Sequence, residues 1–183
     1  CVQVCPYQAI TKIIVPCESA CPVGAITKGE DGHAQIDFDK CISCGKCVSA
    51  CPFGAVHEKS QIIDVLKNIK AGKKVIAMIA PAIMGQLPCT PKQLRQAILE
   101  LGFDDVYEVA QGADVTTKTE AAEFEERLEH GAEFMTTSCC AGYNELVDKH
   151  IPELKPFRSD TKTPLYYTAE IVKKEHPDAV TVF

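Results

Sequence analysis

Apolar residues follow two different patterns in the second half of the chain. Residues 74–80 form a continuous apolar run of strand length, which is typical of a strand buried on both faces of a parallel sheet. Residues 90–102 instead show apolar positions three and four apart. They start with Thr90-Pro91-Lys92-Gln93, which offers a capping residue, an early proline and a glutamine at the third position. The two patterns predict a strand followed by a helix.

The same alternation continues to the last residues. It predicts strands at residues 105–109, 132–136 and 179–183, and helices at residues 114–130, 141–150 and 163–174. An amphipathic helix at residues 58–73 precedes the first strand and reads as a linker. Strands that alternate with helices favour a parallel sheet with helices on its faces. We therefore expect a partial α/β domain over residues 74–183.

The first 57 residues are dominated by cysteines, since eight of the eleven in the chain lie there. Cys41, Cys44 and Cys47, followed by Cys51-Pro52, have the spacing of bacterial ferredoxins. There, three close thiolates bind one 4Fe-4S cube and the fourth cysteine ligates a second cube. Zinc sites usually need two cysteine pairs separated by a longer loop, so the spacing disfavours zinc. We predict a ferredoxin-like α+β module over residues 1–57, with short strands such as residues 34–38 and one or two 4Fe-4S clusters.

A Cys-x3-Cys-Pro element is repeated within this module. Its cysteine pairs are Cys1 and Cys5, Cys17 and Cys21, and Cys47 and Cys51. Cys21 lies at the usual ferredoxin distance to complete the first cluster, with Cys5 as the competitor. The second cluster would use Cys51 and sulfurs from among Cys1, Cys5 and Cys17. The threefold repeat leaves this second ligand set open.

Composition and charge narrow the function classes. A chain of 183 residues has room for one ordinary domain and a small one, and its net charge of −6, with acidic residues concentrated at 120–133, argues against a nucleic-acid partner. No apolar run is long enough to span a bilayer and no segment resembles a signal peptide, so we expect no membrane partner and a cytoplasmic location. The chain starts at Cys1 without a methionine and stops at Phe183 inside a strand-like run, which indicates a fragment.

Three short elements of the second half occur in an informative order. They are Ala80-Pro81-Ala82, Leu101-Gly102-Phe103-Asp104 and Thr137-Ser138-Cys139-Cys140. Together with the upstream ferredoxin-type module, they resemble the iron-only (FeFe) hydrogenases over essentially the whole chain. The Thr-Ser-Cys-Cys element is the first signature of that family's active-site domain. Ala141-Gly142-Tyr143 replaces the common Pro-Gly-Trp, which favours a divergent subgroup.

The resemblance implies an H-cluster in the complete protein, in which a 4Fe-4S cube is joined to a di-iron unit. Cys140 matches a ligand of the cube, and Ala80 and Pro81 match backbone positions near the di-iron ligands. The later signatures that carry the other three cube ligands are absent from this chain. The resemblance also implies maturation proteins and a ferredoxin or another redox carrier as partners.

Glu120, Glu123 and Arg127 are spaced three and four apart, so they share one face of the predicted helix. From spacing alone, a solvated salt-bridged face explains them as well. The resemblance implies a proton relay that runs through Cys139, Glu120, Ser159, Glu123 and Arg127. It thus implies reversible dihydrogen oxidation and proton reduction. The alternatives are a hydrogen sensor or a hydrogenase-like iron-sulfur assembly or electron-transfer protein without turnover.

Overall fold

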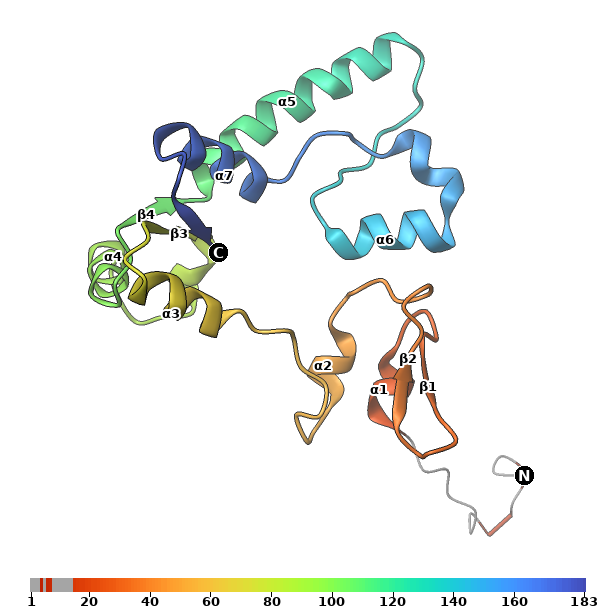
Figure 1. Cartoon of the computed structure of the whole chain (residues 1–183). Helices are drawn as coiled ribbons and strands as arrows, with labels where there is room; N and C mark the ends of the chain where they lie inside the picture. Colours follow the sequence, from red (N-terminus) through yellow and green to blue (C-terminus); the bar gives the residue numbers. More distant parts are fainter. Residues whose placement is uncertain (1–3, 5, 8–14) are drawn as a thin grey trace. The chain divides into compact units, whose positions relative to one another are not determined.

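The protein is described by a computed structural model that covers Val4, Pro6, Tyr7 and residues 15–183. It divides into two compact units (Figure 1). The first unit contains residues 1–59 and 141–155, and the second contains residues 60–140 and 156–183. Neither unit is continuous in sequence. The division of the chain into functional domains at 1–57, 58–73 and 74–183 stays a prediction.

The first unit contains a small hairpin and short helices. Strands β1 (Ile26–Lys28) and β2 (Ala34–Ile36) pair antiparallel, with Ile26 opposite Ile36, so the predicted strand near residue 34 is confirmed. Helix α1 (Pro16–Ala20) lies beside helix α2 (Lys46–Ala50). Each short helix carries one cysteine and is followed at once by another, which is how the sequence repeat appears in the structure. Helix α6 (Ala141–His150) completes this unit.

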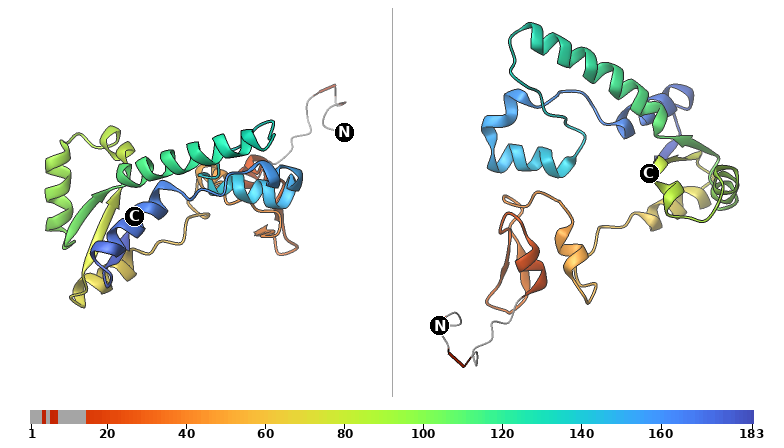
Figure 2. Two further views of the ribbon diagram at one scale, coloured as in Figure 1. Left: turned by 90° about the horizontal axis from the view of Figure 1, so that it is seen from above. Right: turned by 180° about the vertical axis from the view of Figure 1, so that it is seen from behind.

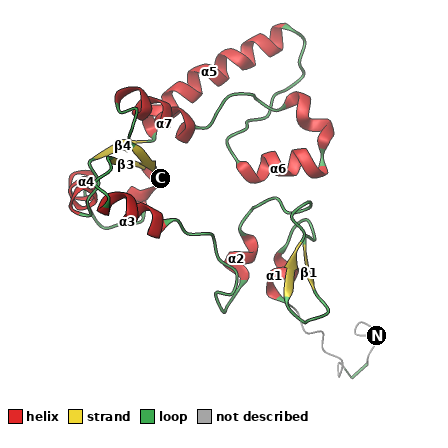
Figure 3. Ribbon diagram, viewed as in Figure 1, coloured by secondary structure: helices red, strands yellow, loops and turns green. Residues whose placement is uncertain are grey.

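A three-stranded parallel sheet lies at the centre of the second unit (Figure 3). Its order is β4-β3-β5, formed by β4 (Asp105–Glu108), β3 (Val75–Ile79) and β5 (Val180–Val182). In register, Ile76 faces Asp105 and Val75 faces Val180. Four of the five residues of β3 are buried, as expected for the central strand of a covered parallel sheet. The predicted strands at residues 74–80, 105–109 and 179–183 are therefore confirmed.

Helices cover this sheet. Those that pack against its strands are α3 (Ile62–Lys70), α4 (Pro91–Glu100) and α7 (Pro164–Glu175). Helix α5 (Ala110–Glu129) packs on α7 instead. The core packs Ile76 and Met78 of β3 against Val172 of α7. Thr90 and Gln93 form the predicted capping box at the start of α4. Short 3-10 helices at Pro81–Gly85 (η2) and Pro152–Phe157 (η3) link the larger elements.

Helices α5 and α7 lie side by side in all views (Figure 2). Gly112 makes this approach possible, because a Cβ at that position would lie 2.0 Å from the Pro164 carbonyl oxygen and 2.4 Å from Thr168 Oγ1. Thr168 is fully buried and donates to the Pro164 carbonyl at 2.9 Å. The glycine therefore sets how closely α5 packs on α7.

Three predicted elements differ from the structure. The helix predicted at residues 114–130 starts four residues earlier, at Ala110. Residues 132–136 form no strand of their own: Thr136 makes a single parallel bridge to Arg158, while Phe134 stacks on Phe157 with ring centroids 4.3 Å apart. The aromatic contact, rather than a ladder of backbone hydrogen bonds, anchors this segment. The predicted helix at residues 58–73 is shorter, because α3 starts only at Ile62 and stops before Gly72, whose φ of 67° is left-handed.

Candidate iron-sulfur site and active site

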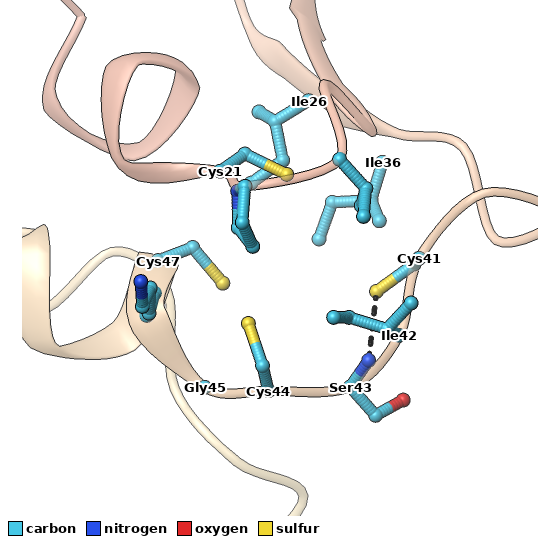
Figure 4. A pocket seen from close by; sticks show the side chains of 12 residues that line it. Cys21, Ile26, Ile36, Cys41, Ile42, Ser43, Cys44, Gly45 and Cys47 are labelled. Atoms are coloured by element: carbon cyan, nitrogen blue, oxygen red, sulfur yellow. Dashed lines mark hydrogen bonds between the residues drawn. The ribbon is translucent and has the colours of Figure 1, made fainter. Parts of the chain in front are cut away.

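Four thiols of the first unit point into one small cavity (Figure 4). Cys21 follows α1, Cys41 and Cys44 lie on the loop before α2, and Cys47 lies in α2. Ile26, Ile36 and Ile42 line the same cavity. We call Cys21, Cys41, Cys44 and Cys47 the four-thiol site. Cys5, the competing fourth ligand, and Cys1 lie outside the described residues.

The loop that carries Cys41 and Cys44 takes an unusual backbone course. Ser43 has a φ of 54° and Gly45 a φ of 75°, both in the left-handed region. Gly45 tolerates this without strain, whereas Ser43 does so at a cost of about 1 kcal/mol. The Ser43 N–H points toward Cys41 Sγ at 3.4 Å, and the Ala25 N–H toward Cys21 Sγ at 3.2 Å. Backbone donors of this kind stabilise thiolates and lower the charge density on cluster sulfurs.

This donor set fits a 4Fe-4S cube. Within the described part of the chain, no three His, Cys, Asp or Glu side chains lie close enough to hold a single metal ion. A 4Fe-4S cube needs a wider arrangement of ligands, because each thiolate binds a separate iron at its own corner and the sulfurs lie further apart. Four thiols around one cavity with apolar walls provide that arrangement.

The second cluster has fewer described candidates. Cys17 is buried within α1, and Cys51 follows α2. Backbone hydrogen bonds, the largest from Phe53, lower the pKa of the Cys51 thiol, and the Ala55 N–H lies 3.2 Å from its sulfur. Cys51 thus favours the thiolate that metal binding needs. The roles of Cys1, Cys5, Cys17 and Cys51 in a second cluster stay a prediction.

The Cys139-Cys140 pair lies at the end of a polar segment of the second unit. Both thiols are exposed, and Thr137 Oγ1 lies 3.9 Å from Cys139 Sγ. Ser138 donates to the Thr161 carbonyl at 2.6 Å. Thr136 exchanges backbone hydrogen bonds with Phe157 and Ser159, both at 2.8 Å. The segment before the cysteine pair is therefore held against residues 157–161.

The same residues 157–161 also bind helix α5. Glu123 of α5 accepts hydrogen bonds from Ser159 Oγ at 2.7 Å and Thr161 Oγ1 at 2.8 Å, and from the Asp160 N–H at 2.9 Å. Arg127 forms an ion pair with Glu123 at 2.7 Å and donates to the carbonyls of Pro156 and Arg158. Glu123, Arg127, Ser159 and Thr161 form what we call the acid–hydroxyl cluster.

The acid–hydroxyl cluster is largely closed to solvent. The side chains of Glu123 and Arg127 are 17% and 23% exposed, and Ser159 and Thr161 are buried. Burial raises the pKa of Glu123, but the hydrogen bonds from Ser159, Asp160, Thr161 and Arg127 together outweigh it and lower that pKa from 4.5 to about 2. Glu123 is therefore an anion held by several donors.

The structure brings together three of the five predicted relay residues, namely Ser159, Glu123 and Arg127. Among the described residues, no hydrogen bond joins Cys139 or Glu120 to this cluster; Glu120 is half-buried on the same helix. Sequence reasoning missed Thr161, although it is a second hydroxyl on the Glu123 carboxylate. Its only sequence signal is the alternation of hydroxyl residues at 159, 161 and 163.

Ala80 and Pro81 lie where β3 ends and η2 begins. They border a cavity of about 430 Å³ at the carboxyl ends of β3 and β4, whose polar lining includes Arg95, Glu108 and Gln111. Ligands of open parallel sheets gather at this edge. The predicted location of Ala80 and Pro81 at a strand end is confirmed, and their contact with a di-iron unit stays a prediction.

Two known protein families match parts of this sequence. The family described as "Iron only hydrogenase large subunit, C-terminal domain" matches residues 73–183, and the "4Fe-4S binding domain" matches residues 34–57. The chain belongs to the iron-only hydrogenase family. This confirms the recognition made from the Thr-Ser-Cys-Cys element and the ferredoxin motif. The cofactors of the complete protein are accordingly 4Fe-4S clusters and an H-cluster.

Known hydrogenases align with most of this chain. The periplasmic Fe hydrogenase large subunit of Nitratidesulfovibrio vulgaris is 35% identical over 184 residues, which cover 76% of this chain and 44% of that protein. Iron hydrogenase 1 of Clostridium pasteurianum is 32% identical over 196 residues, which cover 78% of this chain and 34% of that protein. The solved structure of the FeFe-hydrogenase HydA1 of Chlamydomonas reinhardtii has a TM-score of 0.59 at 30% identity, over 67% of this chain and 36% of that one.

The chain spans less than half the length of these hydrogenases, and 27% of the NADP-reducing hydrogenase subunit HndD of Solidesulfovibrio fructosivorans. No helix within the described residues is both long and apolar enough to cross a membrane. The cytoplasmic location stays a prediction.

Proposed function

We propose that this chain belongs to an enzyme that interconverts dihydrogen with protons and electrons. Within that enzyme it provides the electron-relay module and the first segment of the active-site domain. The observation that supports this best is the acid–hydroxyl cluster, which residues 157–161 link to the segment of the Thr137-Ser138-Cys139-Cys140 signature. A carboxylate that is largely closed to solvent and accepts hydrogen bonds from two hydroxyl groups is suited to exchanging protons.

Cys140 would bind the H-cluster cube, with the backbone of Ala80 and Pro81 beside the di-iron unit. The H-cluster supplies the metal centre at which the bond of dihydrogen is broken or formed. This chain supplies one thiolate to that group, and the other cube ligands are expected from the later signatures of the family.

The proton path would start at Cys139 Sγ, which is exposed and belongs to no disulfide. A water molecule would connect it to the Glu120 carboxyl group. Ser159 Oγ would then give its proton to the Glu123 carboxylate, to which it donates at 2.7 Å, and would regain one from the Glu120 carboxyl group. Arg127, ion-paired to Glu123, would keep the carboxylate in place at the outer end of the path, where Glu123 releases the proton to water.

Electrons would travel through the first unit. The four-thiol site would hold one 4Fe-4S cube, and Cys51 with upstream cysteines a second. A ferredoxin or another one-electron carrier would exchange electrons with these clusters, and maturation proteins would install the H-cluster. A component of the Na(+)-translocating ferredoxin:NAD(+) oxidoreductase complex of Acetobacterium woodii is 45% identical to this chain over 60 residues, which supports such a carrier.

One observation favours a second function, that of a hydrogen sensor with little turnover. The hydrogen bonds that lower the pKa of Glu123 to about 2 keep its side chain almost entirely ionised at pH 7. A carboxylate that resists protonation slows a relay that passes through it. Rapid hydrogen production would exclude this alternative.

The test uses the full-length holoprotein and measures dihydrogen production from a reduced dye, together with iron content. Cys139→Ala should abolish production while the iron content stays unchanged, because Cys139 is proposed to carry protons and not metal. Cys89→Ala, which removes an isolated thiol of the second unit, is the matched control and should retain full activity. Unchanged production by Cys139→Ala would overturn the relay.

A further inference from the structure

The last turn of helix α6 binds the loop that leads into the four-thiol site. Both belong to the first unit. Lys149 Nζ donates to the carbonyl oxygens of Phe38 at 2.9 Å and Cys41 at 2.8 Å. His150 Nε2 lies 2.8 Å from the carbonyl oxygen of Lys40, and since a carbonyl can only accept, Nε2 carries the proton. Two adjacent side chains thus hold three carbonyls of one short loop.

The loop is shaped so that these carbonyls are available. The Asp37 carbonyl accepts the N–H groups of Lys40 and Cys41, and the Asp37 carboxylate accepts the N–H of Asp39. The amide groups of the loop are therefore satisfied locally, while its carbonyl oxygens need other donors. Lys149 and His150 provide them, which fixes the backbone of Cys41 while its sulfur faces the cavity.

Lys149 is also a cation that donates directly to the backbone of Cys41, which carries one of the four thiols. Its side chain is 28% exposed, so solvent screens its charge only in part. The nearby Lys40 is 60% exposed and already paired with Asp37 at 3.1 Å. When a one-electron carrier reduces the four-thiol site, the negative charge inside the ring of thiolates increases by one. A fixed positive charge next to Cys41 stabilises the reduced form more than the oxidised form.

We propose that Lys149 is a positioning residue that raises the reduction potential of the cluster held by Cys21, Cys41, Cys44 and Cys47, and so eases the arrival of electrons at that cluster. This rests on the proposed function, because it needs a redox cluster in the four-thiol site. Glu145 opposes the effect. It pairs with Lys149 at 2.7 Å from one turn earlier in α6 and partly neutralises its charge.

The opposite charges of Lys149 and Glu145 give a test that separates electrostatics from structure. The holoprotein is titrated with dithionite, and the reduced clusters are followed by electron paramagnetic resonance. The electron paramagnetic resonance signal that disappears in Cys44→Ala is assigned to the cluster in the four-thiol site. Lys149→Met should lower the equilibrium constant for reduction of that cluster by about threefold to tenfold, or roughly 30–60 mV. Lys149→Arg, which keeps the charge, should leave it near its original value.

Glu145→Gln is the decisive partner variant, because it keeps the contacts of Lys149 to the loop. It should shift the potential upward, opposite to Lys149→Met. Lys155→Met, which removes a surface cation paired with Asp148 in the same unit, is the control and should leave the potential unchanged. Shifts of the same direction in Lys149→Met and Glu145→Gln, or no shift in either, would overturn the inference. The absence of any cluster signal in the unmodified protein would instead overturn the proposed electron relay.

Discussion

The four-thiol site lies on one loop and two short helices of the first unit, whereas the acid–hydroxyl cluster joins a 20-residue helix to a segment 36 residues further along the chain. Three of the four thiols lie within seven consecutive positions, and the walls of their cavity are a few isoleucines. The acid–hydroxyl cluster instead depends on the packing of α5, α7 and residues 157–161. Bound metal should therefore stabilise the first site, and tertiary packing the second.

The largest difference between the sites should appear on removal of a thiol. Cys44→Ala takes one ligand from the four-thiol site, and we expect the loss of the iron and sulfide of one cube. The acid–hydroxyl cluster lies in the other unit and should be unaffected. Iron and acid-labile sulfide analysis measures the effect, with Cys89→Ala as the control. Iron content equal to that of the unmodified protein would show that the four thiols do not hold a cube together.

A change in the packing of α5 on α7 should instead affect the second unit and spare the four-thiol site. Gly112→Ala puts a methyl group against the Pro164 carbonyl and Thr168, so α5 must move away from α7. We expect a loss of about 3 kcal/mol in the free energy of unfolding, measured by urea denaturation. Gly85→Ala is the matched control, since its new Cβ meets open space and its φ is not left-handed. Equal stability of the two variants would contradict the close approach of α5 and α7.

The charge of Glu123 makes the stability of the second unit depend on pH. Its pKa is lowered from 4.5 to about 2 in the fold, so the stabilisation is complete above about pH 4.5 and disappears as the pH falls toward 2. At neutral pH it amounts to at most about 3 kcal/mol, because some of the side chain remains exposed. Glu123→Gln should therefore reduce the free energy of unfolding at pH 7 more than at pH 3.

The control for this experiment is Glu126→Gln, which changes an exposed carboxylate of the same helix. It should alter stability little at either pH. A Glu123→Gln penalty of the same size at pH 3 and pH 7 would mean that the charge of Glu123 contributes nothing.

The smallest expected effect concerns one hydroxyl of the acid–hydroxyl cluster. Thr161→Val removes a donor to Glu123 Oε2 at 2.8 Å and keeps the shape of the side chain. We expect a loss of about 1 kcal/mol and a higher pKa of Glu123, measured by NMR titration of its carboxyl group. Thr119→Val removes a hydroxyl that bonds only within α5 and should leave this pKa unchanged. No change of the Glu123 pKa in Thr161→Val would contradict the assigned contact.

The sequence predicted the parts of the molecule whose physical cause is local. Ligand spacing alone predicted that Cys41, Cys44 and Cys47 line one site, because three thiols within seven positions lie close together. The apolar run at residues 74–80 predicted β3, since a strand covered on both faces has few polar positions. The capping box at Thr90 is likewise a contact within four residues.

The failures involve contacts between distant residues. The predicted strand at residues 132–136 was wrong, because the stacking of Phe134 on Phe157 and a single bridge replace a ladder. Thr161 was missed since its hydroxyl matters only after residues 157–161 fold against α5. The contacts of Lys149 cross more than a hundred positions, which no local spacing reveals. The link between Glu123 and Ser159 was predicted by family resemblance and not by the helical spacing.

We propose that this chain contributes to dihydrogen chemistry with Cys139 as the proton carrier. Isotope exchange tests it most directly: the holoprotein is exposed to deuterium gas in ordinary water, and mass spectrometry follows the formation of HD. This reaction needs dihydrogen cleavage and a proton path but no external electron carrier. We expect steady HD formation by the unmodified protein and its loss in Cys139→Ala at equal iron content. No HD from a fully loaded holoprotein, or undiminished HD from Cys139→Ala, would contradict it.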